Sequence, residues 1–242
     1  MGPGAVKAEG VPSAEAIVEE AQRRVAAKRP PSGRVWLVYW LSKHWLALLN
    51  ALDAIYLGIP FLAPVLMYTG HERAANVIYR AYRFVCHQLP FRSWFLFGEH
   101  AAYPLTEPIS LAQLEAARDF IGNAQMGYKV AFCQRDVATY AAILLGGLIY
   151  AVIRRRWSIK PLPWWAFILF GIVPMGLDGG YQWFTYFRWW YHLSSVPPHE
   201  TTPWMRTFTG ALFGFAAVWL IYPLLETFFA DVRRLLEPRF HS

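Results

Sequence analysis

Ten polar residues in the sequence have side chains suited to ligand binding or catalysis. They include both cysteines of the chain, a histidine adjacent to the first cysteine, three arginines and two aspartates. The set is Cys86, His87, Gln88, Arg92, Cys133, Arg135, Asp136, Asp178, Gln182 and Arg206. Thiolates and carboxylates bind metal ions, thiolates also act as nucleophiles, and guanidinium groups bind anions. We predict that these residues form one polar cluster, because the topology derived below places all of them at the same end of the chain's helices.

The two cysteines allow several interpretations. A disulfide between Cys86 and Cys133 would close a long loop and stabilise the fold by about 4 kcal/mol. Alternatively, Cys86, His87 and Cys133, with Asp136 as a further ligand, could hold a metal ion such as zinc, because these are zinc-binding side chains. A thiolate activated by His87 would be a nucleophile, and two inert thiols are the remaining case. The sequence leaves these readings open.

Asp178 also has two interpretations. It lies in Met-Gly-Leu-Asp-Gly-Gly and could accept hydrogen bonds from the amides of a turn at the water boundary. It could instead pair with Arg135 or Arg206 beside Gln182, since a charge inside a membrane protein usually has a partner. The second interpretation places Asp178 in the polar cluster.

The composition indicates a membrane protein. The 242 residues are 56% hydrophobic and 16% charged, whereas a soluble domain carries about 25% charged residues. Twelve Trp, 13 Tyr and 17 Phe agree with this, because aromatic rings concentrate at membrane interfaces. The net charge of +7 does not indicate nucleic-acid binding, because the basic residues lie between apolar segments and not along one soluble face.

Hydrophobic runs predict the all-α class, with about four transmembrane helices and an extracytoplasmic cap. The predicted spans are about 45–68, 137–153, 163–180 and 207–229. They lie within a transmembrane domain of residues 45–229, which follows a polar tail and interfacial helix at 1–44 and precedes a tail at 230–242. Short basic links face the cytoplasm, so Arg154, Arg155, Arg156 and Lys160 place the second link and both termini there, in a multi-pass protein of the cell membrane.

The outer loop, residues 70–136, is expected to fold as the cap. Polar residues recur at helical spacing from Arg73 to Val85, which predicts an amphipathic helix at the interface. A second helix is expected over 111–121, because Ser110 and Gln113 form a capping-box pattern.

Two glycines open the last predicted span. Gly210 and Gly214 form Gly-x-x-x-Gly, a pattern that lets another helix approach closely. We expect that helix to belong to the same chain.

Four short motifs together resemble a known family. They are Cys86-His87-Gln88-Leu89-Pro90-Phe91-Arg92-Ser93, Cys133-Gln134-Arg135-Asp136, Asp178-Gly179 with Gln182, and Arg206 with Thr209-Gly210. In this order they resemble the uncharacterised prokaryotic membrane family called domain of unknown function 2085, over residues 50–228. That family has a final Cys where this chain has Asp136, and a shorter stretch between the first two motifs. The resemblance implies a shared architecture and a shared polar site.

Three functions fit the sequence. The first is a structural or binding membrane protein whose cluster is held by a disulfide or ion pairs. The second is a membrane-embedded enzyme that depends on a metal or a thiol, so the sequence leaves open whether the chain is an enzyme. The third is a small-solute carrier or an accessory subunit of a membrane complex. The lipid bilayer is the expected partner in every case, and the aromatic surface also suits a membrane-protein partner or a homo-oligomer.

Overall fold

The computed structural model describes residues 13–28, 32–105 and 107–240. This part of the chain is mostly helical, with 70% helix and 6% strand. Its contacts divide it into two compact units, Leu46–Glu226 and the residues outside that range at both ends. The larger unit contains the predicted polar cluster.

The smaller unit is helical. Its helix α1 spans Ala14–Lys28. The unit also contains the start of α2 (Gly33–Tyr68) and the end of α8 (Pro203–Leu236), followed by a 3-10 turn at Glu237–Arg239. Tyr39 stacks on Phe240 with ring centroids 4.4 Å apart, and Arg233 donates a hydrogen bond of 2.6 Å to the carbonyl oxygen of Ser42. These contacts join the two helix ends within this unit.

Three helices of the described chain are long and apolar enough to cross a membrane. They are α2 (Gly33–Tyr68), α5 (Gln134–Ile153) and α8 (Pro203–Leu236). The first and third are longer than predicted, because the aromatic segment before residue 45 and the segment after residue 229 continue the helices. Three of the four predicted spans therefore correspond to helices of sufficient length and hydrophobicity.

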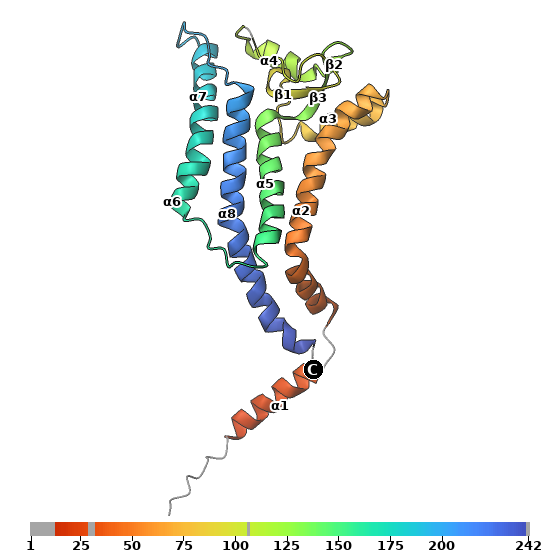
Figure 1. The fold of residues 1–242 in the computed structure, drawn as a ribbon, viewed down its shortest axis with the longest axis vertical. Coiled ribbons are helices and arrows are strands. Elements are labelled where there is room, and N and C mark those ends of the chain that lie inside the picture. Colours follow the sequence, from red (N-terminus) through yellow and green to blue (C-terminus); the bar gives the residue numbers. More distant parts are fainter. Residues whose placement is uncertain (1–12, 29–31, 106, 241–242) are drawn as a thin grey trace, which may run out of the picture. The chain divides into compact units, whose positions relative to one another are not determined.

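The predicted third span forms a different structure. It consists of a short helix α6 (Trp164–Phe167), a π-helical turn (Ile168–Ile172) and helix α7 (Val173–Trp190). This segment is not among the three membrane-length helices. The π turn interrupts the α-helix, and α7 continues into a half that contains Gln182 and Arg188. Figure 1 shows α7 running beside α8 in the larger unit.

The purely α-helical prediction was wrong for the loop between α2 and α5, which contains a three-stranded antiparallel sheet. Its strands are β1 (Ser93–Leu96), β2 (Gly122–Asn123) and β3 (Gly127–Cys133), in the order β1-β3-β2. Val130, Ala131 and Phe132 of β3 are all buried. Burial of consecutive residues removes the alternation of polar and apolar positions by which a half-exposed strand is recognised.

Two helices complete this part of the fold, which we call the sheet region (α3, α4 and the strands, residues 72–133). Helix α3 spans Glu72–Tyr82, and α4 spans Leu111–Asp119. The capping box before α4 is confirmed: the Gln113 amide donates to the Ser110 hydroxyl at 3.3 Å, and the Gln113 side chain accepts from the Ser110 amide at 2.8 Å. Tyr79 of α3 donates a hydrogen bond to the Lys129 carbonyl, which attaches this helix to β3.

Helices α5 and α8 are in backbone contact, as the two glycines predicted. A Cβ atom built on Gly210 would lie 2.6 Å from the carbonyl oxygen of Arg135, and one on Gly214 would lie 2.4 Å from that of Thr139. The Thr139 hydroxyl donates a hydrogen bond of 3.2 Å to the Gly210 carbonyl. The Gly-x-x-x-Gly pattern therefore packs two helices of the same chain.

Candidate functional site

The site lies where the sheet region meets the N-terminal ends of α5 and α8 and the middle of α7. Cys86 follows α3 and its amide donates to the Tyr82 carbonyl at 2.9 Å. Cys133 ends β3 and is the N-cap of α5, since its sulfur accepts from the Asp136 amide at 3.4 Å. The turn after α3 and the strand-to-helix junction thus bring two cysteines distant in sequence to one place.

Of the four interpretations of the cysteines, the disulfide is not supported, because Cys86 and Cys133 are free thiols in the structure. They are 4.1 Å apart, whereas a sulfur–sulfur bond measures about 2.05 Å. Each sulfur has other partners. The Cys133 amide donates to the Cys86 sulfur at 3.2 Å, and the Cys133 thiol donates to an Asp136 carboxylate oxygen at 3.1 Å. A hydrogen bond between the two cysteine side chains, together with burial, raises the pKa of the Cys86 thiol well above its usual value, so this thiol is protonated at neutral pH.

The free thiols lead to a first prediction. After treatment with a chelator and denaturation without reductant, about two thiols per chain should react with a thiol reagent. The melting temperature in detergent should be the same with and without reductant, because no covalent bond is broken. A count near zero that rises to two after reduction would contradict the structure.

Cys86, Cys133 and Asp136 together form a possible metal-binding set. One ligand atom from each, two sulfurs and a carboxylate oxygen, lie within 4.8 Å of one another. The sequence predicted His87 in this set, with Asp136 as a further ligand. His87 is exposed and is not a member of the set, and its backbone carbonyl accepts a hydrogen bond of 3.2 Å from Arg118.

A cavity of about 200 Å³ borders these ligand atoms. Nine of the ten predicted cluster residues line it: Cys86, His87, Gln88, Arg92, Cys133, Arg135, Asp136, Gln182 and Arg206. The cavity is smaller than the roughly 300–1,000 Å³ of sites for drug-sized ligands. It has room for a metal ion together with a small polar ligand.

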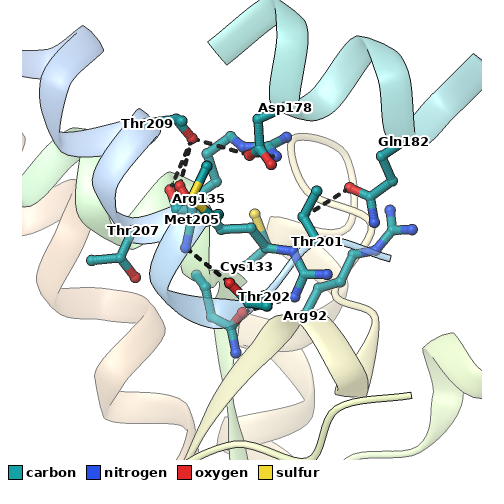
Figure 2. Close-up of polar contacts among 12 residues, drawn as sticks. Arg92, Cys133, Arg135, Asp178, Gln182, Thr201, Thr202, Met205, Thr207 and Thr209 are labelled. Atoms are coloured by element: carbon teal, nitrogen blue, oxygen red, sulfur yellow. Dashed lines mark hydrogen bonds and ion pairs between the residues drawn. The ribbon is translucent and has the colours of Figure 1, made fainter. Parts of the chain in front are cut away.

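Asp178, the tenth residue, does not line this cavity but contacts Arg135, which does. It forms an ion pair with Arg135 and accepts a hydrogen bond of 3.1 Å from the Thr209 hydroxyl. Figure 2 shows these three side chains beside Gln182 and Thr201. Of the two arginines suggested as partners of Asp178, Arg135 is the one that pairs with it. Asp178 therefore does more than accept hydrogen bonds from the amides of a turn.

Glu200 is a central residue that the sequence analysis did not single out. It binds Arg92 through two hydrogen bonds of 2.8 and 2.9 Å and also pairs with Arg206. Arg206 in turn donates to the Gln134 side chain at 2.9 Å and to the Phe91 carbonyl at 3.2 Å. Glu200 follows two prolines and a histidine and lies just before α8. The sequence signal that could have identified it is an acidic residue placed shortly before Arg206 at the start of this helix.

Several buried donors at the cavity have no hydrogen-bond partner among the described residues. They are Arg135 Nε, Arg206 Nε and Gln182 Nε2. The side chains of Arg92 and Arg135 keep 26% and 21% of their surface exposed, so the cationic side of the cavity is accessible. This arrangement suits an electron-rich ligand next to the thiols.

Two histidines between α7 and α8, His192 and His199, lie away from the thiols. His192 lines a cavity with Trp189 and Trp190, and His199 lies against the Tyr181 ring with centroids 5.5 Å apart. Neither lines the cavity of the thiols.

Comparison with known proteins supports the family resemblance. A family model described as predicted membrane protein DUF2085 matches residues 120–220, a range that contains the second, third and fourth motifs. The resemblance to family 2085 is confirmed. The family-2085 match begins after Cys86, so the first motif lies outside it.

One curated relative extends the similarity. The uncharacterized protein MJ1492 of Methanocaldococcus jannaschii is 26% identical over 190 residues, which cover 76% of this chain and 94% of that protein. No solved structure matches the chain. The matched family model describes a predicted membrane protein, and the three apolar helices are consistent with membrane integration.

Proposed function

We propose that the chain is a multi-pass membrane protein that binds a divalent metal ion, zinc by preference, at Cys86, Cys133 and Asp136. The observation that carries the proposal is the convergence of two sulfurs and one carboxylate oxygen within 4.8 Å at the edge of a cavity. Two thiolates favour zinc over the hard cations magnesium and calcium, which prefer oxygen ligands.

The distances support a site that needs little rearrangement. In a tetrahedral zinc site with zinc–sulfur bonds of about 2.3 Å, the two sulfurs are about 3.8 Å apart. Cys86 and Cys133 are 4.1 Å apart, and the Cys133 sulfur lies 3.1 Å from an Asp136 oxygen. Three protein ligands leave a fourth position for water or another ligand, as in zinc sites that remain open.

The membrane arrangement proposed with this site has four spans: α2, α5, the α6–α7 segment and α8. The basic link Arg154–Lys160 supports a cytoplasmic location for the α5–α6 connection and for both termini. Under that topology the sheet region is the extracytoplasmic cap, and the metal site faces outward beneath it. Arg92, Arg135 and Gln182 would then contact a small anionic ligand that reaches the metal from outside.

The test uses the full chain purified in detergent, stripped with a chelator and titrated with cobalt(II) or zinc. We expect about one ion per chain, with the absorption bands of cobalt–thiolate coordination. Cys86→Ala and Cys133→Ala should each weaken zinc binding by more than 100-fold, since loss of a second-shell partner alone costs about 10–100-fold. Asp136→Cys should tighten zinc binding, because it adds a third thiolate.

The pH dependence of zinc binding follows from the protonation of the Cys86 thiol. Because the pKa of Cys86 is raised, zinc must displace its proton at neutral pH. Zinc affinity should therefore rise with pH, by up to about tenfold per unit for each proton released.

His199→Ala serves as the control, because this histidine lies outside the cavity and should leave zinc binding unchanged. Failure to bind cobalt or zinc in the intact chain would reject the metal site. It would support the second candidate, a structural role, which is favoured by the ion pairs that join Arg92, Arg206 and Glu200.

A further inference from the structure

A second cavity lies within the sheet region, between α3, α4 and β3. It has a volume of about 260 Å³ and is separate from the proposed metal ligands, none of which lines it. Its charged lining residues are Arg80, Arg83, Arg118, Asp119 and Lys129. The three arginines and the single carboxylate give the cavity lining a net charge of +2, and protonated Lys129 raises it to +3. Such an excess of positive charge favours an anionic ligand.

The basic groups are held in place by the backbone. Lys129, which is 1% exposed, donates hydrogen bonds to the carbonyls of Gln88 at 2.7 Å and Arg118 at 2.9 Å. An ammonium group has three donors, so one remains for a ligand. Arg83 pairs with Asp119 and donates to the Arg118 carbonyl at 3.2 Å. The cations are thus oriented before any ligand binds.

Lys129 has no acid of its own in the cavity. Burial, together with the positive charge of Arg83, lowers the pKa of this lysine to about 7. The single nearby carboxylate, Asp119, is engaged by Arg83. A phosphate group in the cavity would supply the missing negative charge.

Arg80 is the unpaired cation at the cavity. It lines the cavity from α3 and makes no hydrogen bond or ion pair with the described residues. Its guanidinium can therefore bind two oxygens of a phosphate without breaking an existing contact.

Apolar side chains flank these cations on α3 and the turn after it. Val77, Phe84 and Val85 are 67%, 93% and 58% exposed. An amphipathic helix with exposed apolar side chains beside arginines is typical of a segment at the membrane surface. The phosphate that reaches this cavity would then belong to a lipid.

We propose that the cavity between α3, α4 and β3 binds the phosphate headgroup of an anionic membrane lipid. Arg80 and Lys129 contact the phosphate, and Phe84 lies among the acyl chains. This proposal rests on the membrane integration of the chain and is independent of metal binding.

The test uses the delipidated full-length protein in detergent, with dioleoyl phosphatidic acid as the probe and native mass spectrometry as the readout of affinity. Arg80→Gln should weaken binding about tenfold, the effect of losing a charge-assisted hydrogen bond. Arg73→Gln is the matched control, because Arg73 is on the same helix and is also unpaired but does not line the cavity. It should change the affinity less than twofold.

Two results would overturn the lipid site. Equal effects of Arg80→Gln and Arg73→Gln would mean that the lipid responds only to the net charge of α3. Inorganic phosphate that displaces the lipid at equal concentration would indicate a soluble ligand. Cys86→Ala should leave lipid binding intact, so loss of the metal site and loss of the lipid site are distinguishable.

Discussion

Replacing Arg206 by methionine should lower the stability of the protein by about 3 kcal/mol. Truncation of one partner in a buried ion pair costs about 3–5 kcal/mol. The lower value applies, because Glu200 would keep its two hydrogen bonds to Arg92. The Gln134 side chain and the Phe91 carbonyl would lose a donor in a buried position.

The measurement is the melting temperature of the purified protein in detergent. About 3 kcal/mol corresponds to a decrease of roughly 6–12 °C for a chain of this size. Arg206→Lys should give a smaller decrease, because it retains the charge and loses the branched geometry. Arg234→Met is the control: its side chain is 81% exposed and pairs with Asp231 at 3.5 Å, so its loss should be near neutral. An unchanged melting temperature for Arg206→Met would show that the buried pair contributes no stability.

The second large effect is expected at Gly214. Gly214→Ala would place a Cβ atom 2.4 Å from the Thr139 carbonyl oxygen and 2.8 Å from the Ala142 Cβ atom. Because the nearest contact is with backbone, helices α5 and α8 must separate, and overpacking of this kind costs about 1–3 kcal/mol.

The matched control is Gly58→Ala in α2, where an added Cβ atom would meet nothing within 4 Å. This substitution should be neutral or slightly stabilising, because alanine is the better helix former. Both variants are compared by melting temperature and by size-exclusion chromatography in detergent. Similar behaviour of the two would mean that the close contact between α5 and α8 is not needed for stability.

The proximity of the cluster residues could be predicted because several of them lie near the ends of the predicted spans. A hydrophobic run fixes where a span ends, and the topology then places Cys133, Arg135, Asp178 and Arg206 at one end of the bundle. Nine of the ten predicted residues line the same cavity for this reason. The Asp178–Arg135 pair follows from the rule that charges in such positions have partners.

Other features depended on tertiary contacts that no local pattern records. Residues Val130–Phe132 of β3 are consecutive and buried, so periodicity did not distinguish this strand from a helical segment. The sequence allowed a disulfide between its two cysteines, but both are free thiols, and the Cys133 thiol donates to the Asp136 carboxylate. Glu200 was overlooked because its two arginine partners come from distant parts of the sequence.

The contacts of α8 also bear on how the protein is made. Gly210, Gly214 and Arg206 all belong to α8, which is synthesised after α5. Until α8 is made, the carbonyls of Arg135 and Thr139 lack their close contact with it, and the Gln134 side chain lacks the donor that Arg206 supplies. The packing of α5 is therefore completed only after α8 has been synthesised, and a premature stop before Arg206 leaves the Gln134 side chain without this donor.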